Sequence, residues 1–239
     1  YMLVLLNLTF RGFMKTIKIL ISLIVISTFA TSYSNADEGF GLGAAVGYYK
    51  VSADGTETEG TAADTSDRTE SVSNNVFLPA LFAEFEASNG FRLGFEYTPV
   101  AADVSDKVKS RTETAVGVSG ESTDGAITRK ANAEVDGHYV IYAELPVYNT
   151  WYIRAGYTEL DVTTTETAQT DGGTYGNKSG LSGYNVGLGT TGSAGANGYY
   201  KLAFEYTDFD TLSLSSTSNN SISADLDTMA LRYSLGYKF

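Results

Sequence analysis

Nine charged side chains share the polar face of alternating segments of the chain. Four are basic and five are acidic: Arg92, Arg154, Lys201, Arg232, Glu84, Glu86, Glu96, Glu144 and Glu205. In a confined interior these charges should pair, because an unpaired buried charge is strongly unfavourable. We favour a structural network of ion pairs that plugs the interior. The alternative is a gate or narrow ion path that opens when the pairs rearrange. Gly and Thr line the other, outer half of the predicted interior, which is expected to be wetter.

His138 is the only histidine, so it is the only imidazole available for acid–base catalysis. A hydrolase or acyltransferase would place it beside a serine and a carboxylate. Ser119, Ser122 and Asp136 are near in sequence, but serine is common in this chain and these serines fall in a predicted long loop. We therefore expect no catalytic residues and interpret His138 as a hydrogen-bonding side chain of the interior.

A run of acids surrounds the single base Arg68 in another predicted loop: Asp54, Glu57, Glu59, Asp64, Asp67 and Glu70. Hard divalent cations prefer such oxygen ligands, but the run lacks the spacing of an EF-hand. We interpret these acids as solvating residues, with weak Ca²⁺ or Mg²⁺ binding as the alternative. No dedicated metal site and no cofactor are expected.

The elements that position these residues are strands. In residues 231–239, large apolar or aromatic side chains alternate with polar or small ones, so a strand here has one apolar and one polar face. Alternation recurs eight times, at 40–52, 74–88, 91–103, 132–146, 151–164, 180–191, 199–212 and 224–239. Pro79 fits poorly because it cannot donate to a ladder, and it is expected at a bulge or strand end.

The connections alternate in length. Short turns at 88–90, 146–150 and 192–198 alternate with long polar loops at 53–73, 104–131, 165–179 and 213–223. This pattern predicts an all-β fold, an eight-stranded antiparallel up-and-down transmembrane β-barrel with its turns in the periplasm. An aromatic girdle is expected at the short-turn ends, from Phe91, Tyr148, Trp151 and Tyr199. A soluble periplasmic barrel or sandwich is the alternative, since it would show the same two faces with the apolar one inside.

The first residues are typical of export. Residues 14–36 contain a basic start, an apolar run from Ile19 to Phe29 and small residues before Ala36, as in a secretory signal peptide. Residues 1–13 are interpreted as an upstream reading-frame extension, and 37–239 as one barrel domain. No apolar segment after Ala36 is long enough to span a bilayer as a helix.

Charge and cysteine content exclude other classes. Removing Arg11, Lys15 and Lys18 with the leader changes the formal charge from −12 to −15. So acidic a chain, with no basic patch in view, is not expected to bind nucleic acid. Cysteine is absent, which excludes disulfides and thiol chemistry.

Together these features resemble the outer-membrane protein A-like and opacity-type small eight-stranded β-barrels. The resemblance covers the predicted mature chain, and its local signature is the terminal strand with Tyr237 and Phe239, the residues expected to guide barrel insertion. It implies a monomer in the outer membrane of a Gram-negative bacterium. The implied partners are outer-membrane lipid, lipopolysaccharide and the barrel-assembly machinery. It also implies a role in envelope integrity or surface contact, with a small passive channel for ions or apolar solutes as the alternative.

Overall fold

The computed structural model describes residues 38–61, 64–105, 109–116, 122–167, 175–216 and 220–239. The segments 1–13 and 14–36 lie outside this part of the chain. Its strands are β1 (Gly39–Thr61), β2 (Asp64–Glu86), β3 (Arg92–Tyr97), β4 (Ala102–Asp103), β5 (Lys109–Val116), β6 (Ser122–Tyr148), β7 (Trp151–Thr167), β8 (Lys178–Ser193), β9 (Gly198–Phe209), β10 (Leu212–Ser215) and β11 (Ser221–Lys238). In these residues we find no helix with the length and apolar character needed to cross a membrane.

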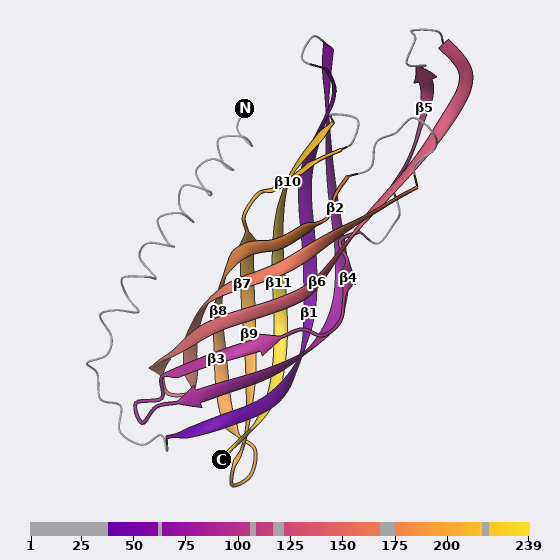
Figure 1. Cartoon of the computed structure of the whole chain (residues 1–239). Coiled ribbons are helices and arrows are strands. Elements are labelled where there is room, and N and C mark those ends of the chain that lie inside the picture. Colours follow the sequence, from indigo (N-terminus) through magenta and orange to yellow (C-terminus); the bar gives the residue numbers. More distant parts are fainter. Residues whose placement is uncertain (1–37, 62–63, 106–108, 117–121, 168–174, 217–219) are drawn as a thin grey trace.

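Eight strands close into a ring (Figure 1). The order is β1-β2-β3-β6-β7-β8-β9-β11, and β11 pairs with β1 to complete the circle. All pairings of the ring are antiparallel. Outside the ring order, β4 and β5 pair with β6, and β10 pairs with β11. The predicted eight-stranded up-and-down barrel is therefore confirmed.

Short turns join the strands at one end of the barrel, as the sequence predicts. Two of them reverse the chain through left-handed backbone, at Gly90 (φ 78°) and Asn149 (φ 50°). Glycine and asparagine are the residues that adopt this conformation most readily. These tight turns fix the register of the β2–β3 and β6–β7 hairpins, and with it the face that each side chain occupies.

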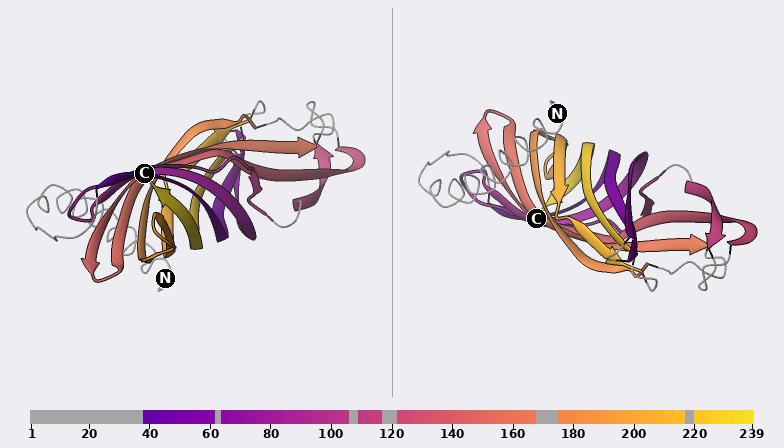
Figure 2. Two further views of the ribbon diagram at one scale, coloured as in Figure 1. Left: turned by 90° about the horizontal axis from the view of Figure 1, so that it is seen from below. Right: turned by 90° about the horizontal axis from the view of Figure 1, so that it is seen from above.

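At the other end the predicted long loops are largely wrong. The β1–β2 ladder continues to the pair Thr61 and Asp64, and β5 pairs with β6 from Lys109 to Val116. The sequence 53–73 is polar on both faces, so it lacks the apolar alternation that marks a membrane strand. Its many Thr residues nevertheless suit extended backbone. The barrel thus carries an extension beyond its membrane part, in which the β5–β6 hairpin reaches far to one side (Figure 2).

The part of the barrel next to the short turns, here called the lower barrel, has an apolar outer surface. Large apolar side chains from all eight ring strands point outward and are well exposed, among them Leu42, Leu81, Phe95, Ile141, Ile153, Leu188, Leu202, Phe204, Leu231 and Leu235. Toward the extension this belt ends at Tyr48, Tyr97, Tyr157, Tyr184 and Met229. A closed ring with such a belt satisfies its backbone internally and offers hydrocarbon contact to lipid. The barrel is transmembrane.

Inside, the barrel has two layers of opposite character. The charged residues fill the half near the short turns. The other half holds buried apolar side chains, here called the upper apolar cluster: Tyr49, Val51, Val104, Leu160, Val162, Leu181, Phe209, Leu226 and Ala230. The expectation of a wet outer half lined by Gly and Thr is wrong. Apolar residues move from the outward to the inward face where β1, β7, β8, β9 and β11 leave the membrane.

Candidate functional site

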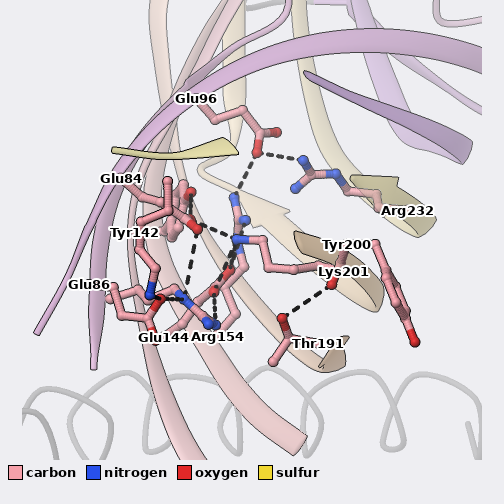
Figure 3. Close-up of polar contacts among 12 residues, drawn as sticks. Glu84, Glu86, Glu96, Tyr142, Glu144, Arg154, Thr191, Tyr200, Lys201 and Arg232 are labelled. Atoms are coloured by element: carbon pink, nitrogen blue, oxygen red, sulfur yellow. Dashed lines mark hydrogen bonds and ion pairs between the residues drawn. The ribbon is translucent and has the colours of Figure 1, made fainter. Parts of the chain in front are cut away.

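The structure brings all nine predicted lumen charges into one network. Figure 3 shows part of it, around Lys201, Glu96 and Arg154. The nine residues come from β2, β3, β6, β7, β9 and β11, and eight of the nine are no more than 8% exposed. Each lies on the inward face of its strand. Glu86, at the short-turn edge, is only partly buried.

Lys201 holds the part of the network nearest the short turns. Its Nζ donates to Glu84 Oε2 at 2.7 Å and to Glu144 Oε1 at 3.0 Å. Arg92 adds a second cation, with Nε 3.3 Å from Glu86 Oε2 and Nη1 3.6 Å from Glu144 Oε2. Each carboxylate of this group therefore contacts at least one base from another strand.

Glu96 holds the part nearer the extension. Its Oε2 accepts from Arg154 Nη2 at 3.2 Å and from Arg232 Nη2. Arg232 Nη1 also donates to Glu205 Oε1 at 2.9 Å, and Asn185 Nδ2 donates to Glu205 Oε2 at 3.3 Å. One carboxylate, on β3, thus joins guanidinium groups from β7 and β11, two strands that are not neighbours in the ring.

Arg154 and Tyr142 connect the two groups. Arg154 Nη1 lies 3.6 Å from Glu144, and its guanidinium carbon lies 3.7 Å from the centre of the Tyr142 ring. The Tyr142 hydroxyl donates to Glu84 Oε2 at 2.6 Å. Gly94, the register partner of Tyr142, makes room for that ring, because an added Cβ would lie 2.3 Å from its Cζ.

Sequence reasoning missed a tenth member, Lys238. Its Nζ lies 3.1 Å from Glu86 Oε2. Position 238 shares the even-numbered inward face of β11 with Arg232, so the alternation already contained the signal. With Lys238 the network has five bases and five acids, and its formal charges cancel.

The predicted girdle residues separate in the structure. Tyr148 and Trp151 are exposed on the outside beside the short turn at 149–150. Phe91 is half-buried in the β2–β3 turn, where its N–H donates to Asn89 Oδ1. The girdle placement of Tyr199 is wrong. Its ring packs against Phe82 inside the barrel, in the space that Gly41 and Gly236 leave beside it.

The terminal strand also locks the ring. Tyr237 and Phe239 are exposed and pack against each other, with ring centroids 5.1 Å apart. The N–H of Phe239 donates to the carbonyl of Phe40 at 2.9 Å. The first and last strands are thus joined up to the final residue.

His138 occupies a bulge of β6 between Asp136 and Tyr139. Its Nδ1 lies 3.2 Å from Thr98 Oγ1, and its ring meets Phe209 edge-on. Ser119 lies outside the described residues. In the described part of the chain, no recorded hydrogen bond joins His138 to a carboxylate.

The acids of the predicted 53–73 loop belong to the β1–β2 hairpin. Asp67 accepts from Thr58 Oγ1 at 2.8 Å, and Glu57 accepts from the Tyr175 hydroxyl at 2.7 Å. Across the residues that the structure describes, no three His, Asp or Glu side chains are placed to hold a metal ion.

No protein-family model and no curated protein matches the sequence. Solved structures match by shape. Neisserial surface protein A shares 12% identity over 85% of this chain and all of its own, with a TM-score of 0.43. The outer membrane protease OmpT of Escherichia coli shares 10% identity over 88% of this chain and 99% of its own, with a TM-score of 0.46. The outer membrane protein OprG of Pseudomonas aeruginosa shares 12% identity over 82% of this chain and 96% of its own, with a TM-score of 0.39.

The ring, the outward belt and the charged interior belong to this chain itself. An antiparallel ring with a lipid-facing belt and short turns at one end is the architecture of bacterial outer-membrane proteins. The protein is a small outer-membrane β-barrel.

Proposed function

We propose that this barrel is a structural and surface-interaction protein of the outer membrane, with a lumen closed to ions. The observation that carries the proposal is the occupied interior. Paired charges fill one half and apolar side chains fill the other, while eight strands form a ring whose interior side chains can fill. A barrel without an aqueous path acts through its contacts with lipid and through what it displays outside.

The extension supplies the display. The β1–β2 hairpin carries mainly acids, whereas bases occur at several register positions of β5–β6, with Arg111 directly opposite Arg129. Hairpins of contrasting charge on a rigid base suit selective surface contact, since charge complementarity favours some partners and repels others. The proposed partners are outer-membrane lipid and lipopolysaccharide around the belt, and the assembly machinery at Tyr237 and Phe239. We propose a monomer.

Single-channel recording of the refolded chain 37–239 in a planar bilayer tests the closed lumen. We expect no conductance steps, with folding verified by a heat-modifiable shift on a gel. The alternative function, a passive ion channel, predicts stable steps whose ion selectivity changes in Arg232→Gln or Glu205→Gln. Such steps would overturn the proposal.

A shortened hairpin separates the structural role from the surface role. Gly55 pairs with Glu70, so replacing residues 55–70 by a two-residue turn leaves Asp54 opposite Ser71 in the existing register. In a strain lacking the protein, a purely structural barrel would restore detergent resistance with either the full or the shortened chain. A surface role in addition predicts that the shortened chain restores resistance but not cell attachment.

A further inference from the structure

The wall of the barrel is not hydrogen-bonded over its whole height. β2 pairs with β3 only between Leu81–Glu86 and Arg92–Tyr97, and β4 and β5 then pair with β6. Within the described residues, no backbone ladder joins β2 above Leu81 to these strands, and β3 is confined to the lower barrel (Figure 1). The last pair of this ladder is Leu81 and Tyr97. Just beyond it lie Pro79 on β2 and Pro99 after β3, and neither has an N–H to donate. We call this break between β2 and residues 98–104 the seam.

One side-chain hydrogen bond fastens the seam. Asn74 Nδ2 donates to the backbone carbonyl of Asp103 at 2.8 Å, and Asn132 Nδ2 holds the Asp103 carboxylate at 2.7 Å. Backbone ladders join the other neighbours of the ring over this height, except that the β8–β9 ladder ends at the pair Gly183 and Phe209 and β10 pairs with β11 alone. At the seam, two strands can part by breaking far fewer bonds.

Next to the belt, the seam is apolar on both of its faces, whereas Asn74 and Asp103 lie farther toward the extension. Outside, Phe77 is 72% exposed and Val100 is 41% exposed, beside Tyr97 at the top of the lipid-facing belt. Inside, Leu78 and Val104 belong to or pack against the upper apolar cluster. An apolar group crossing here would leave lipid and meet further apolar side chains, without contact with a charged layer.

The charge network lies below this cluster. It closes the route toward the short turns to any apolar molecule, because entry would separate buried ion pairs. Above, the outward surface is polar, with Lys50 and Asp54 exposed on β1. The break between β8 and β10 has polar groups where it begins, since the Asp210 N–H donates to the Ser182 carbonyl and the Ser182 hydroxyl donates to the Asp210 carboxylate. Of the two breaks in the described wall, the seam is the one with apolar side chains next to the belt.

We propose that the seam admits a lipid acyl chain from the outer leaflet, which binds in the upper apolar cluster. The position of the seam identifies the molecule that binds. The belt places membrane hydrocarbon against Phe77 and Tyr97, so acyl chains are the apolar molecules present there. The site is a dead end that leaves the lumen closed to ions. It does not depend on the proposed surface role.

Photo-labelling in liposomes tests this site. The probe is palmitate with a diazirine near its methyl end, added to the refolded chain, and adducts are mapped by mass spectrometry. Boundary lipid alone predicts adducts on outward residues such as Leu202. The proposal predicts additional adducts on inward Val104, Leu160 and Leu181.

Cysteine pairs test the route, since the chain has no cysteine of its own. Asn74→Cys with Asp103→Cys, joined by a short methanethiosulfonate cross-linker, closes the seam. The matched control is Ser52→Cys with Ser73→Cys, which staples directly paired residues of β1 and β2. Inward adducts should vanish in the cross-linked seam variant, return on reduction and persist in the control.

Either of two results would overturn the proposal. If folded protein gives adducts on outward residues alone, the upper cluster takes no acyl chain. If inward adducts persist when the seam is cross-linked, the chain enters by another path. The heat-modifiable gel shift verifies that every variant folds. The conductance experiment on the proposed function measures ion flow, so its outcome does not decide whether inward adducts form.

Discussion

Glu96 is 1% exposed, so no water can replace its carboxylate as the partner of the two guanidinium groups that it contacts. Glu96→Gln removes the charge that Arg154 and Arg232 share and leaves buried cations under-compensated. We expect a loss of about 3–5 kcal/mol in unfolding free energy, the usual consequence of removing one partner from a buried pair. Urea unfolding in lipid, followed by the fluorescence of the single tryptophan, Trp151, measures it.

Glu86→Gln is the matched control. Its side chain is 12% exposed at the short-turn edge, where water can solvate Arg92 and Lys238 in its absence. A smaller loss than in Glu96→Gln is expected there, because Glu86 and Lys238 are more exposed than the partners of Glu96. Equal losses in the two variants would show that burial does not govern the energetics of the network.

Asp227 gives a second residue-scale prediction, this one for pH. It lies beyond the belt, directly opposite Asp208 on β9 and near Asp54 on β1. Burial raises the pKa of its carboxyl, and the charges of Asp54 and Asp208 raise it further. The folded state therefore binds a proton more tightly than the unfolded state, and stability falls as pH rises from the unfolded pKa through the folded one. Asp227→Asn should raise the melting temperature at pH 7.5, with the gain vanishing below about pH 4, near the ordinary Asp pKa.

Asp161→Asn should show the opposite sign. Its carboxylate accepts from Ser179 Oγ and from the N–H of Gly180, and these bonds lower the pKa of Asp161. Here the stabilisation is present above the unfolded pKa and is lost as pH falls through the folded one. Thermal melts of both variants across pH check the pair. A stabilised Asp161→Asn at pH 7.5 would contradict this account.

At the scale of the element, β2 shows what the sequence could and could not predict. Its lower part alternates clearly, with Leu81 and Phe85 outward and Glu84 inward, so both its face and its place in the charge network were predictable. The sequence predicts a loop for its first residues, up to 73, because polar residues occupy both faces there. Pro79 marked the change, but the loss of a second neighbour depends on where β3 ends, which is a long-range property. The girdle position that the sequence predicts for Tyr199 is wrong for a related reason. The space beside Gly236, which the Tyr199 side chain fills, exists only once the strands pair into the barrel.

Hydrogen exchange should reveal the one-sided pairing of β2. Alternate amides of a strand face opposite neighbours, so above Leu81 half of them face the seam. We expect alternate amides between positions 67 and 80 to exchange faster than those of 81–86, which have strands on both sides. Residue-resolved exchange in lipid nanodiscs measures this. Uniform protection along β2 would mean that another strand closes the seam in solution.

For the whole molecule, the change of apolar face divides the barrel into two folding problems. In β1 the change falls between outward Tyr48 and inward Tyr49, and in β11 between outward Met229 and inward Leu226. Below it, lipid covers the apolar surface and the interior is charged. Above it, water covers the outside and the interior is apolar, as in a soluble protein. The sequence contains this change as a shift in the phase of alternation, but reading it requires knowing that the strands continue beyond the membrane.

Substitutions of two leucines of β8 should therefore have different effects. Leu181 is 2% exposed inside the upper cluster, whereas Leu188 is 50% exposed toward lipid. Leu181→Ala should lower the unfolding free energy of the extension by about 2–5 kcal/mol, as cavities in packed cores do. It should leave the stability of the membrane part unchanged. The gel shift of the membrane part should remain while limited proteolysis cuts the extension at lower protease concentration. Leu188→Asp should instead impair folding into liposomes, because it places a charge against hydrocarbon. If Leu181→Ala abolished the gel shift, the two halves would be one cooperative unit, and the extension would help to build the barrel that supports it.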